Sequence, residues 1–352
     1  MRRRLPALAL MVATTVALQP AEPASAVGRA RVVKCMKPRA CWITAFAFTP
    51  AGDELFYAER FSGEIRRVVL STGSDTRWAK IRGVAGVGEQ GSLGIALDPD
   101  WEAGEEQVFV SYTQRRPLRN KIERLSKTGG KLQRKTLVTI AANTYHIAGP
   151  IHFGPDGKLY AVTGDAGVPS RSQRVRNPAG KVLRMEESGA RPSDNPFANG
   201  KAFSIGHRNS FGFAFDPVNG RLWQSENGPT CDDEINMVLP GRNYGWGGGS
   251  ACPRTSESGP NPVQPEFRIN PLTAPTGVAF CDACGLGAEM DGDLLYGTYL
   301  TRKIHALDLN AERDGVTGRR VILSHPRAVL AVEAAPDGTV YFSDLWAIYR
   351  LV

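Results

Sequence analysis

The sequence predicts an all-β protein, a six-bladed β-propeller, because one short motif recurs along the chain. The motif is a turn rich in Pro, Asp, Asn and Gly, followed by alternating aliphatic and aromatic residues. Pro presets φ at the first turn position and Asp/Asn-Gly closes a hairpin, so each copy indicates a turn leading into a half-buried strand. Helical periodicity is almost absent, and 38 Gly with 24 Pro suit a turn-rich chain.

Six copies of the motif give the number of blades. They occupy residues 49–57, 98–112, 154–160, 216–223, 289–296 and 335–341, and the copy at 289–296 lacks the proline. Their blade-like spacing favours a single propeller domain over 27–352. Two β-sandwiches are the alternative, but no Pro/Ser/Gly-rich linker interrupts the repeat. We expect an insertion at about 253–271, and we expect the first ordered strand to pair with the last ones and close the ring.

The first 26 residues read as a secretory signal peptide. A basic start at Arg2, Arg3 and Arg4 precedes an apolar stretch over 5–18, and small residues at 24–26 suit a cleavage site. The apolar stretch is too short for a stable membrane span, and no later segment approaches one. We therefore predict an exported, secreted protein without a transmembrane segment.

The cysteine content agrees with export, and the net charge does not indicate a nucleic-acid partner. The six cysteines suit an oxidising compartment, and we expect local pairs, although six allow fifteen connectivities. These pairs are Cys35–Cys41, Cys231–Cys252 and Cys281–Cys284. Zinc is disfavoured at Cys281–Cys284 because no second Cys pair or paired His accompanies it. The formal net charge of +8 is spread along the chain, so no stripe for nucleic acid is indicated.

The densest group of polar residues and glycines lies in 204–246. His207, Arg208 and Asn209 precede one predicted strand pair, and Gly228-Pro229 follows it and leads into the acidic run 232–234. Arginine suits a carboxylate or phosphate held by two hydrogen bonds. An acidic cluster behind a Gly-Pro turn suits a hard cation. The alternative is that these are structural loop residues.

A histidine and an aspartate flank a second pair of predicted strands. His146 precedes one strand and Asp165 follows the next, so the hairpin can bring both to one mouth. A carboxylate bonded to one imidazole nitrogen fixes the tautomer and raises basicity, as a general base requires. The alternative is a capped loop histidine. We expect His152 to be a core histidine, and neither His305 nor His325 has a neighbour that suggests a site.

The sequence motifs of serine hydrolases and of phosphate-binding glycine loops are both absent. The sequence contains no G-x-S-x-G elbow of serine hydrolases. The glycine-rich segment 88–94 has no Lys-Ser/Thr end and opens a strand, so it does not indicate a phosphate-binding loop.

Together these motifs resemble the soluble pyrroloquinoline quinone (PQQ)-dependent glucose and aldose sugar dehydrogenases, the glucose/sorbosone dehydrogenase family. Besides His146 and Asp165, the matching segments are 88–97 (GEQGSLGIAL), 206–215 (GHRNSFGFAF), 224–236 (QSENGPTCDDEIN) and 241–246 (GRNYGW). They span nearly the whole chain after residue 26, in the expected order. The resemblance implies the same six-bladed propeller that the repeat predicts.

The resemblance also implies an activity, an oxidation of the C1 hydroxyl of aldoses to the lactone. His146 would take the hydroxyl proton while hydride passes to PQQ, and Asp165 would orient the imidazole. The remaining matches imply cofactor contacts by Arg208, Asn209 and the pair Glu89 and Gln90, with Arg208 also stabilising developing charge. The backbone carbonyls of Gly228 and Pro229 match ligands of Ca²⁺, and Asp233 matches a carboxylate near the base.

One wall of the implied cofactor site departs from the family pattern. Leu300, Ala328 and Leu330 stand where cationic residues are expected, with Arg302, Lys303 and Arg327 nearby, and Phe211 replaces a glutamine. PQQ carries three carboxylates, so a cationic funnel is expected. An alternative is therefore a propeller without PQQ that binds a glycan or a protein. A calcium-dependent lactone hydrolase is less favoured. Such an enzyme needs several side-chain carboxylates and Asn around the ion, whereas here Asp232, Asp233, Glu234 and Asn236 lie in one loop. The sequence names neither the sugar nor the electron acceptor.

Overall fold

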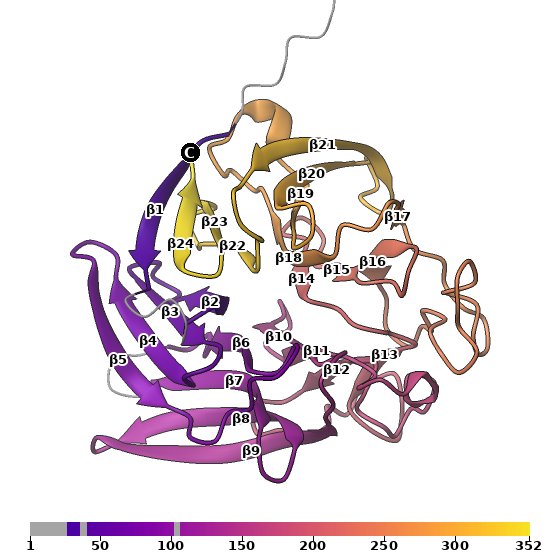
Figure 1. Cartoon of the computed structure of the whole chain (residues 1–352), viewed down its shortest axis with the longest axis horizontal. Helices are drawn as coiled ribbons and strands as arrows, with labels where there is room; N and C mark the ends of the chain where they lie inside the picture. The colour runs from indigo at the N-terminus through magenta and orange to yellow at the C-terminus, as the bar shows by residue number, and fades with distance from the viewer. Residues whose placement is uncertain (1–26, 36–40, 102–105) are drawn as a thin grey trace, which may run out of the picture.

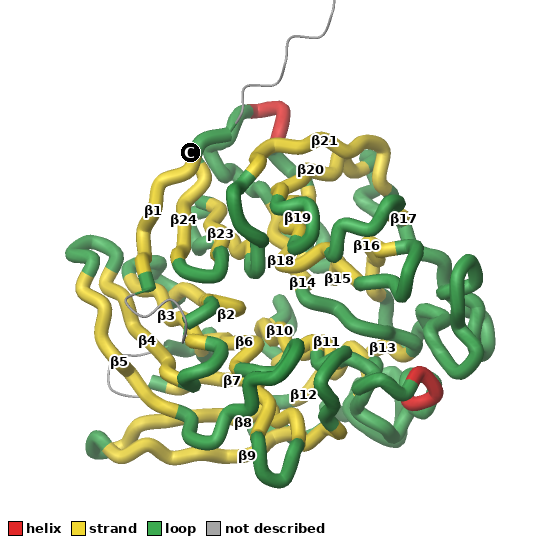
Figure 2. Tube along the Cα trace, in the orientation of Figure 1, coloured by secondary structure: helices red, strands yellow, loops and turns green. Residues whose placement is uncertain are grey.

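The computed structural model describes residues 27–35, 41–101 and 106–352, so the predicted signal peptide at 1–26 lies outside the described residues. The described chain forms six four-stranded antiparallel sheets arranged around a centre, as Figure 1 shows. Strands and loops make up nearly all of it, with two short 3₁₀ turns, η1 (Pro169–Arg171) and η2 (Ala288–Met290) (Figure 2). The predicted six-bladed propeller is confirmed.

Each blade runs outward from an innermost strand. The first three blades are β2 (Ile43–Phe48), β3 (Glu54–Glu59), β4 (Glu64–Val69), β5 (Ser74–Lys80); β6 (Ser92–Leu97), β7 (Gln107–Gln114), β8 (Arg119–Thr128), β9 (Lys131–Ala141); and β10 (Ala148–Phe153), β11 (Leu159–Thr163), β12 (Lys181–Met185), β13 (Ala202–Ile205). The others are β14 (Gly212–Phe215), β15 (Leu222–Glu226), β16 (Asp233–Val238), β17 (Phe267–Ile269); β18 (Pro275–Phe280), β19 (Leu294–Thr298), β20 (Lys303–Leu309), β21 (Val316–Ser324); and β22 (Val332–Ala334), β23 (Val340–Ser343), β24 (Ala347–Leu351), β1 (Arg29–Lys34).

The recurring sequence motif connects the first and second strands of every blade. The connection in the fifth blade, where the proline is missing, is longer and contains η2. Where inner strands of adjacent blades meet, glycine allows a close approach: a Cβ at Gly212 would lie 2.2 Å from the carbonyl oxygen of Thr276. The core lies between blades, and Trp223 of β15, for example, packs in one cluster with Phe280 and Tyr296. Burying each such side chain contributes about 1.5–3 kcal/mol.

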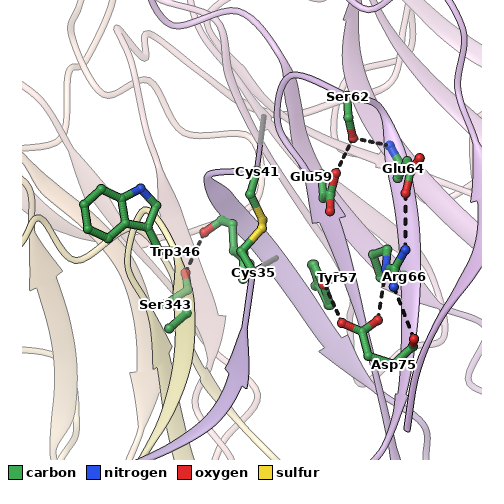
Figure 3. The surroundings of a disulfide bond; sticks show 12 residues. Cys35, Cys41, Tyr57, Glu59, Ser62, Glu64, Arg66, Asp75, Ser343 and Trp346 are labelled. Atoms are coloured by element: carbon green, nitrogen blue, oxygen red, sulfur yellow. Dashed lines mark hydrogen bonds and ion pairs between the residues drawn. A yellow bond between two sulfur atoms is a disulfide. The ribbon is translucent and has the colours of Figure 1, made fainter. Parts of the chain in front are cut away.

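The ring is closed by pairing the first strand with the last, as expected. β1 pairs antiparallel with β24 and so belongs to the sixth blade. Figure 3 shows the disulfide Cys35–Cys41, which links the end of β1 to the start of the first blade. The amide of Cys35 donates to the carbonyl of Trp346 at 2.8 Å, and Ser343 Oγ donates to the carbonyl of Ile43 at 2.7 Å. These bonds tie the last blade to the first.

The other cysteines also form the predicted local pairs, Cys231–Cys252 and Cys281–Cys284. The predicted insertion needs one correction. Its last part, Phe267–Ile269, is the outer strand β17 of the fourth blade, because its backbone pairs with β16. Among the described residues, no helix is long and apolar enough to cross a membrane.

Candidate active site

His146 and Asp165 meet at the end of the third blade where inner strand β10 begins. The imidazole Nδ1 lies 2.7 Å from Asp165 Oδ1. The side chain of Asp165 is fully buried, whereas that of His146 is 20% exposed. His146 has φ of +59°, a left-handed conformation that side chains adopt rarely and that marks functional sites. A buried carboxylate thus holds one nitrogen of an imidazole that stays open to solvent.

The carboxylate of Asp165 is held by two further donors. The backbone N–H of Gly167 donates to Oδ1 at 2.7 Å, and the indole Nε1 of Trp246 donates to Oδ2 at 2.8 Å. Both carboxylate oxygens are therefore fixed in position, and this also fixes the orientation of the His146 imidazole. Sequence reasoning assigned Trp246 no role beyond its motif, because it lies 81 residues from Asp165.

Arg208 lies beside the same indole. Its guanidinium carbon is 5.3 Å from the centroid of the Trp246 ring, and its NH1 group donates to the carbonyl of Asn227 at 2.7 Å. Burial lowers the pKa of Arg208, while the charges of Asp165 and Glu226 act in the opposite direction. The Nε group is buried and has no hydrogen-bond partner among the described residues. A buried donor without a partner costs free energy, so this one is available to a ligand.

Glu89 supports the backbone of the site. Its Oε2 accepts from the amides of His146 at 2.6 Å and Ile147 at 3.3 Å, and from Asn209 Nδ2 at 3.1 Å. Asn209 in turn accepts from the amide of Ala148 at 3.2 Å. One carboxylate oxygen therefore ties together the segments that carry His146 and Asn209, a role that the sequence did not indicate.

Gln90 is buried, and its side-chain amide links its own loop to the segment before β10. Its Oε1 accepts from the amide of Val87 at 3.1 Å, and its Nε2 donates to the carbonyl of Asn143 at 2.9 Å. The same loop is held by Arg60, which donates to the carbonyls of Gly88 and Gln90. Burial lowers the pKa of Arg60, and the charge of Glu89 opposes this. The side chain of Gln90 therefore supports this loop, and its contact with the cofactor stays a prediction.

The Gly228-Pro229 turn presents backbone oxygens. Among the described residues, neither carbonyl oxygen accepts a hydrogen bond. A Cβ at Gly228 would lie 1.9 Å from the carbonyl oxygen of Cys231, so only glycine fits there. Asp233 fixes the turn, because its Oδ1 accepts from the amide of Gly228 at 3.0 Å and its Oδ2 accepts from those of Thr273 and Ala274. Free carbonyl oxygens on a rigid turn are suitable calcium ligands.

The acidic run does not form one cation loop. Asp233 and Glu234 begin strand β16, so the expectation that the acidic residues and Asn236 lie in one loop was wrong. Asp232 pairs with Arg268 at 3.1 Å, whereas Glu234 accepts from Ser256. Burial, followed by the charge of Glu226, raises the pKa of Glu234 to about 7. Asp232 and Glu234 share Arg268, whereas Asp233, between them, points to the other side and accepts from the amides of Gly228, Thr273 and Ala274.

Two of the three cations near the wall that departs from the family pattern donate hydrogen bonds to other described residues. Leu300 is 57% exposed, and Leu330 is buried. Of the nearby cations, Arg302 donates to the carbonyl of Pro326 at 3.3 Å, and Arg327 donates to Asp344 Oδ2 at 2.7 Å.

Three other histidines are engaged inside the protein. His207 is buried, with Nδ1 2.9 Å from Glu226 Oε2 and Nε2 2.8 Å from Ser204 Oγ. His305 stacks on Tyr296, and burial lowers its pKa to about 4. The expectation that His325 lacks an acidic neighbour was wrong: its Nε2 lies 2.9 Å from Asp344 Oδ2. That pair joins β21 to the connection between β23 and β24, which sequence distance concealed.

Asp344 is expected to stabilise the sixth blade. Burial opposes its ionisation, but hydrogen bonds from His325, the amide of Trp346 and Arg327 lower its pKa to about 2. Asp344→Asn should lower the free energy of unfolding at neutral pH by roughly 2–4 kcal/mol. Because the folded-state pKa is depressed, this stability is present above the ordinary value of 3.8 and is lost as pH falls toward about 2. Urea unfolding of both proteins across this range would measure the difference.

The exposed carboxylate of Asp337 provides the control. Asp337→Asn should leave the free energy of unfolding nearly unchanged at every pH. An Asp344→Asn protein as stable as the parent at neutral pH would contradict the assignment.

Comparison with known proteins identifies the family. The family model described as "Glucose / Sorbosone dehydrogenase" matches residues 40–345. The chain belongs to the glucose/sorbosone dehydrogenase family. It is 31% identical over 230 residues to quinoprotein glucose dehydrogenase B of Acinetobacter calcoaceticus, a match that covers 55% of this chain and 48% of that protein. The chain thus matches about half the length of that relative.

Two further similar proteins are matched over more of their length. Aldose sugar dehydrogenase YliI of Escherichia coli K12 is 26% identical over 320 residues, covering 84% of this chain and 85% of that protein. The PQQ-bound structure of an aldose sugar dehydrogenase from Streptomyces coelicolor superposes with a TM-score of 0.79 at 27% identity, covering 94% of this chain and 99% of that one. The family is one of sugar dehydrogenases, and this chain has its propeller.

Proposed function

We propose that this chain is an exported aldose dehydrogenase that uses PQQ and Ca²⁺ and oxidises the C1 hydroxyl of its sugar to the lactone. The observation that carries the proposal is the His146–Asp165 pair, whose Nδ1–Oδ1 distance is 2.7 Å. It lies in the same site as an unpartnered Arg208 Nε group and the free carbonyls of the Gly228-Pro229 turn. Three disulfides suit an oxidising compartment.

The imidazole is the base. Asp165 accepts a hydrogen bond from Nδ1–H of His146, which leaves Nε2 as the unprotonated nitrogen. Nε2 would take the proton of the C1 hydroxyl, and the buried carboxylate would stabilise the imidazolium that forms. The left-handed backbone at His146, held by Glu89, keeps this nitrogen turned to the open side of the pair.

The remaining residues would hold the cofactor. PQQ, when bound, supplies the carbon that accepts the hydride. Arg208, which lies over the indole of Trp246, would donate a hydrogen bond to the quinone, and Asn209 would help to hold the cofactor. The carbonyl oxygens of Gly228 and Pro229 would bind Ca²⁺, which polarises a quinone as a Lewis acid. The observations that fit these groups are the Arg208 Nε donor and the two turn carbonyl oxygens, none of which has a hydrogen-bond partner among the described residues.

The test is reconstitution. Purified protein given PQQ and Ca²⁺ should reduce an artificial electron-accepting dye when an aldose is added, and the absorption spectrum of the quinone should change. Protein given PQQ after chelation of calcium should reduce no dye. Absence of dye reduction and of a spectral change with every aldose would overturn the proposal. Glycan binding that is indifferent to PQQ would then favour a binding propeller without catalysis.

A further inference from the structure

A cavity of about 470 Å³ lies at the end of the propeller opposite the candidate active site. Its walls come from the ends of inner strands β10, β14, β18 and β22 and from the hairpin turns that follow them. His146 precedes β10, whereas His152 lies near its other end, so six residues of strand, about 20 Å, separate this cavity from the candidate active site. The cavity therefore belongs to a different site.

The lining of this cavity is aromatic and acidic. Its apolar walls include four phenylalanines, Phe153, Phe213, Phe215 and Phe280. Three carboxyl groups face it or rim it, those of Glu333, Asp282 and Asp337. No Lys or Arg is among the residues that line it, although the chain has 43 Lys and Arg against 35 Asp and Glu. This absence in a basic protein makes the cavity complementary to a cation.

Glu333 and His152 lie opposite each other inside the cavity. His152 Nε2 is 3.6 Å from Glu333 Oε1, and the imidazole rests edge-on against Phe213 with 4.7 Å between ring centroids. Neither side chain makes a hydrogen bond to another of the described residues. The expectation that His152 is a satisfied core histidine was therefore wrong, because its side chain is 23% exposed to this cavity.

The carboxyl group of Glu333 lacks a compensating charge. Burial raises the pKa of Glu333 well above its usual range, and burial lowers the pKa of His152 to about 4. The neutral imidazole thus provides no positive partner near neutral pH. A cation that entered the cavity would supply one, and phenylalanine faces would attract the same cation through their quadrupoles.

We infer that this cavity binds a small organic cation, an alkyl- or aralkylammonium, with its charge at Glu333 and its apolar body against Phe213, Phe215 and Phe280. A carboxylate or phosphate ligand would meet like charge. Of the described groups that line the cavity, only Glu333 and His152 lie close enough together to share a bare metal ion, and two ligands are too few for Ca²⁺ or Zn²⁺. The inference does not depend on the proposed dehydrogenase activity.

Calorimetric titration with benzyltrimethylammonium tests the inference, because this probe keeps its charge at every pH. We expect saturable binding to the parent protein and weaker binding, by about tenfold or more, to Glu333→Gln. Glu257→Gln changes an exposed carboxylate in the loop before β17 and should bind the probe as the parent does. Benzyl alcohol, which shares the aromatic body but has no charge, should not bind measurably.

The pH dependence of the parent protein gives a second readout that requires no variant. The titratable groups that face the cavity are Glu333, His152, Asp282 and Asp337. A cation favours ionised Glu333, so affinity should increase as pH rises toward the raised pKa of this group and then level off. Equal binding by Glu333→Gln, equal binding of benzyl alcohol, or no heat up to about 10 mM probe would each overturn the inference.

Discussion

Replacing His146 with glutamine is expected to lower the rate of aldose oxidation by roughly 10²–10⁴-fold while sparing cofactor binding. The side chain is the exposed member of a pair whose partner is fully buried, and its Nε2 is the nitrogen left open. Glutamine cannot accept a proton at neutral pH, whereas Arg208 and the free carbonyls at Gly228 and Pro229 remain in place. The reduction should appear in kcat with little change in KM.

Single-turnover dye reduction and quinone absorption would measure the two parts of this prediction separately. Tyr145→Phe is the matched control, since Tyr145 adjoins His146 but is 59% exposed. Its rate should equal that of the parent. Loss of quinone binding by His146→Gln would contradict the role of His146 as a base and would make it a cofactor ligand.

Asp165→Asn is expected to lower kcat by about a hundredfold to a thousandfold, although the side chain keeps its shape. The two carboxylate oxygens accept from three donors, His146 Nδ1, the Gly167 amide and Trp246 Nε1. An asparagine NH₂ must face at least one of these donors. In one outcome the imidazole tautomer reverses, so that Nε2 carries the proton and cannot act as a base. In the other, the hydrogen bond from Trp246 breaks, and the indole that lies against Arg208 is no longer held in position.

Comparison with Trp246→Phe separates these two outcomes. Phenylalanine removes the indole donor but leaves the bond between His146 and Asp165, so kcat should fall less than in Asp165→Asn. A reversed tautomer should also change the dependence of kcat on pH, which loss of packing alone would not. If Asp165→Asn kept more than about a tenth of the parent activity, Asp165 would not orient the base.

The sequence alone determined the architecture because the deciding signals are local. A turn with Pro, Asp and Gly followed by alternating apolar residues specifies a hairpin wherever it occurs, and six copies specify six blades. Cysteines close in sequence could be paired for the same reason, and all three predicted disulfides are present. The His146–Asp165 pair was also predictable, since its members flank the two strands of one hairpin.

The tertiary structure alone decided the contacts between blades. The family resemblance implied a cofactor contact for Glu89, whereas only the structure shows that its carboxylate holds Asn209 from 120 residues away and the backbone of His146. His325, which follows β21 of the fifth blade, meets Asp344, which follows β23 of the sixth. His152 of β10 meets Glu333 of β22, from another blade. A local sequence pattern specifies only the strand pairing within one blade. Contacts between side chains of different blades form only when all six blades pack around one axis, so no local pattern predicts them.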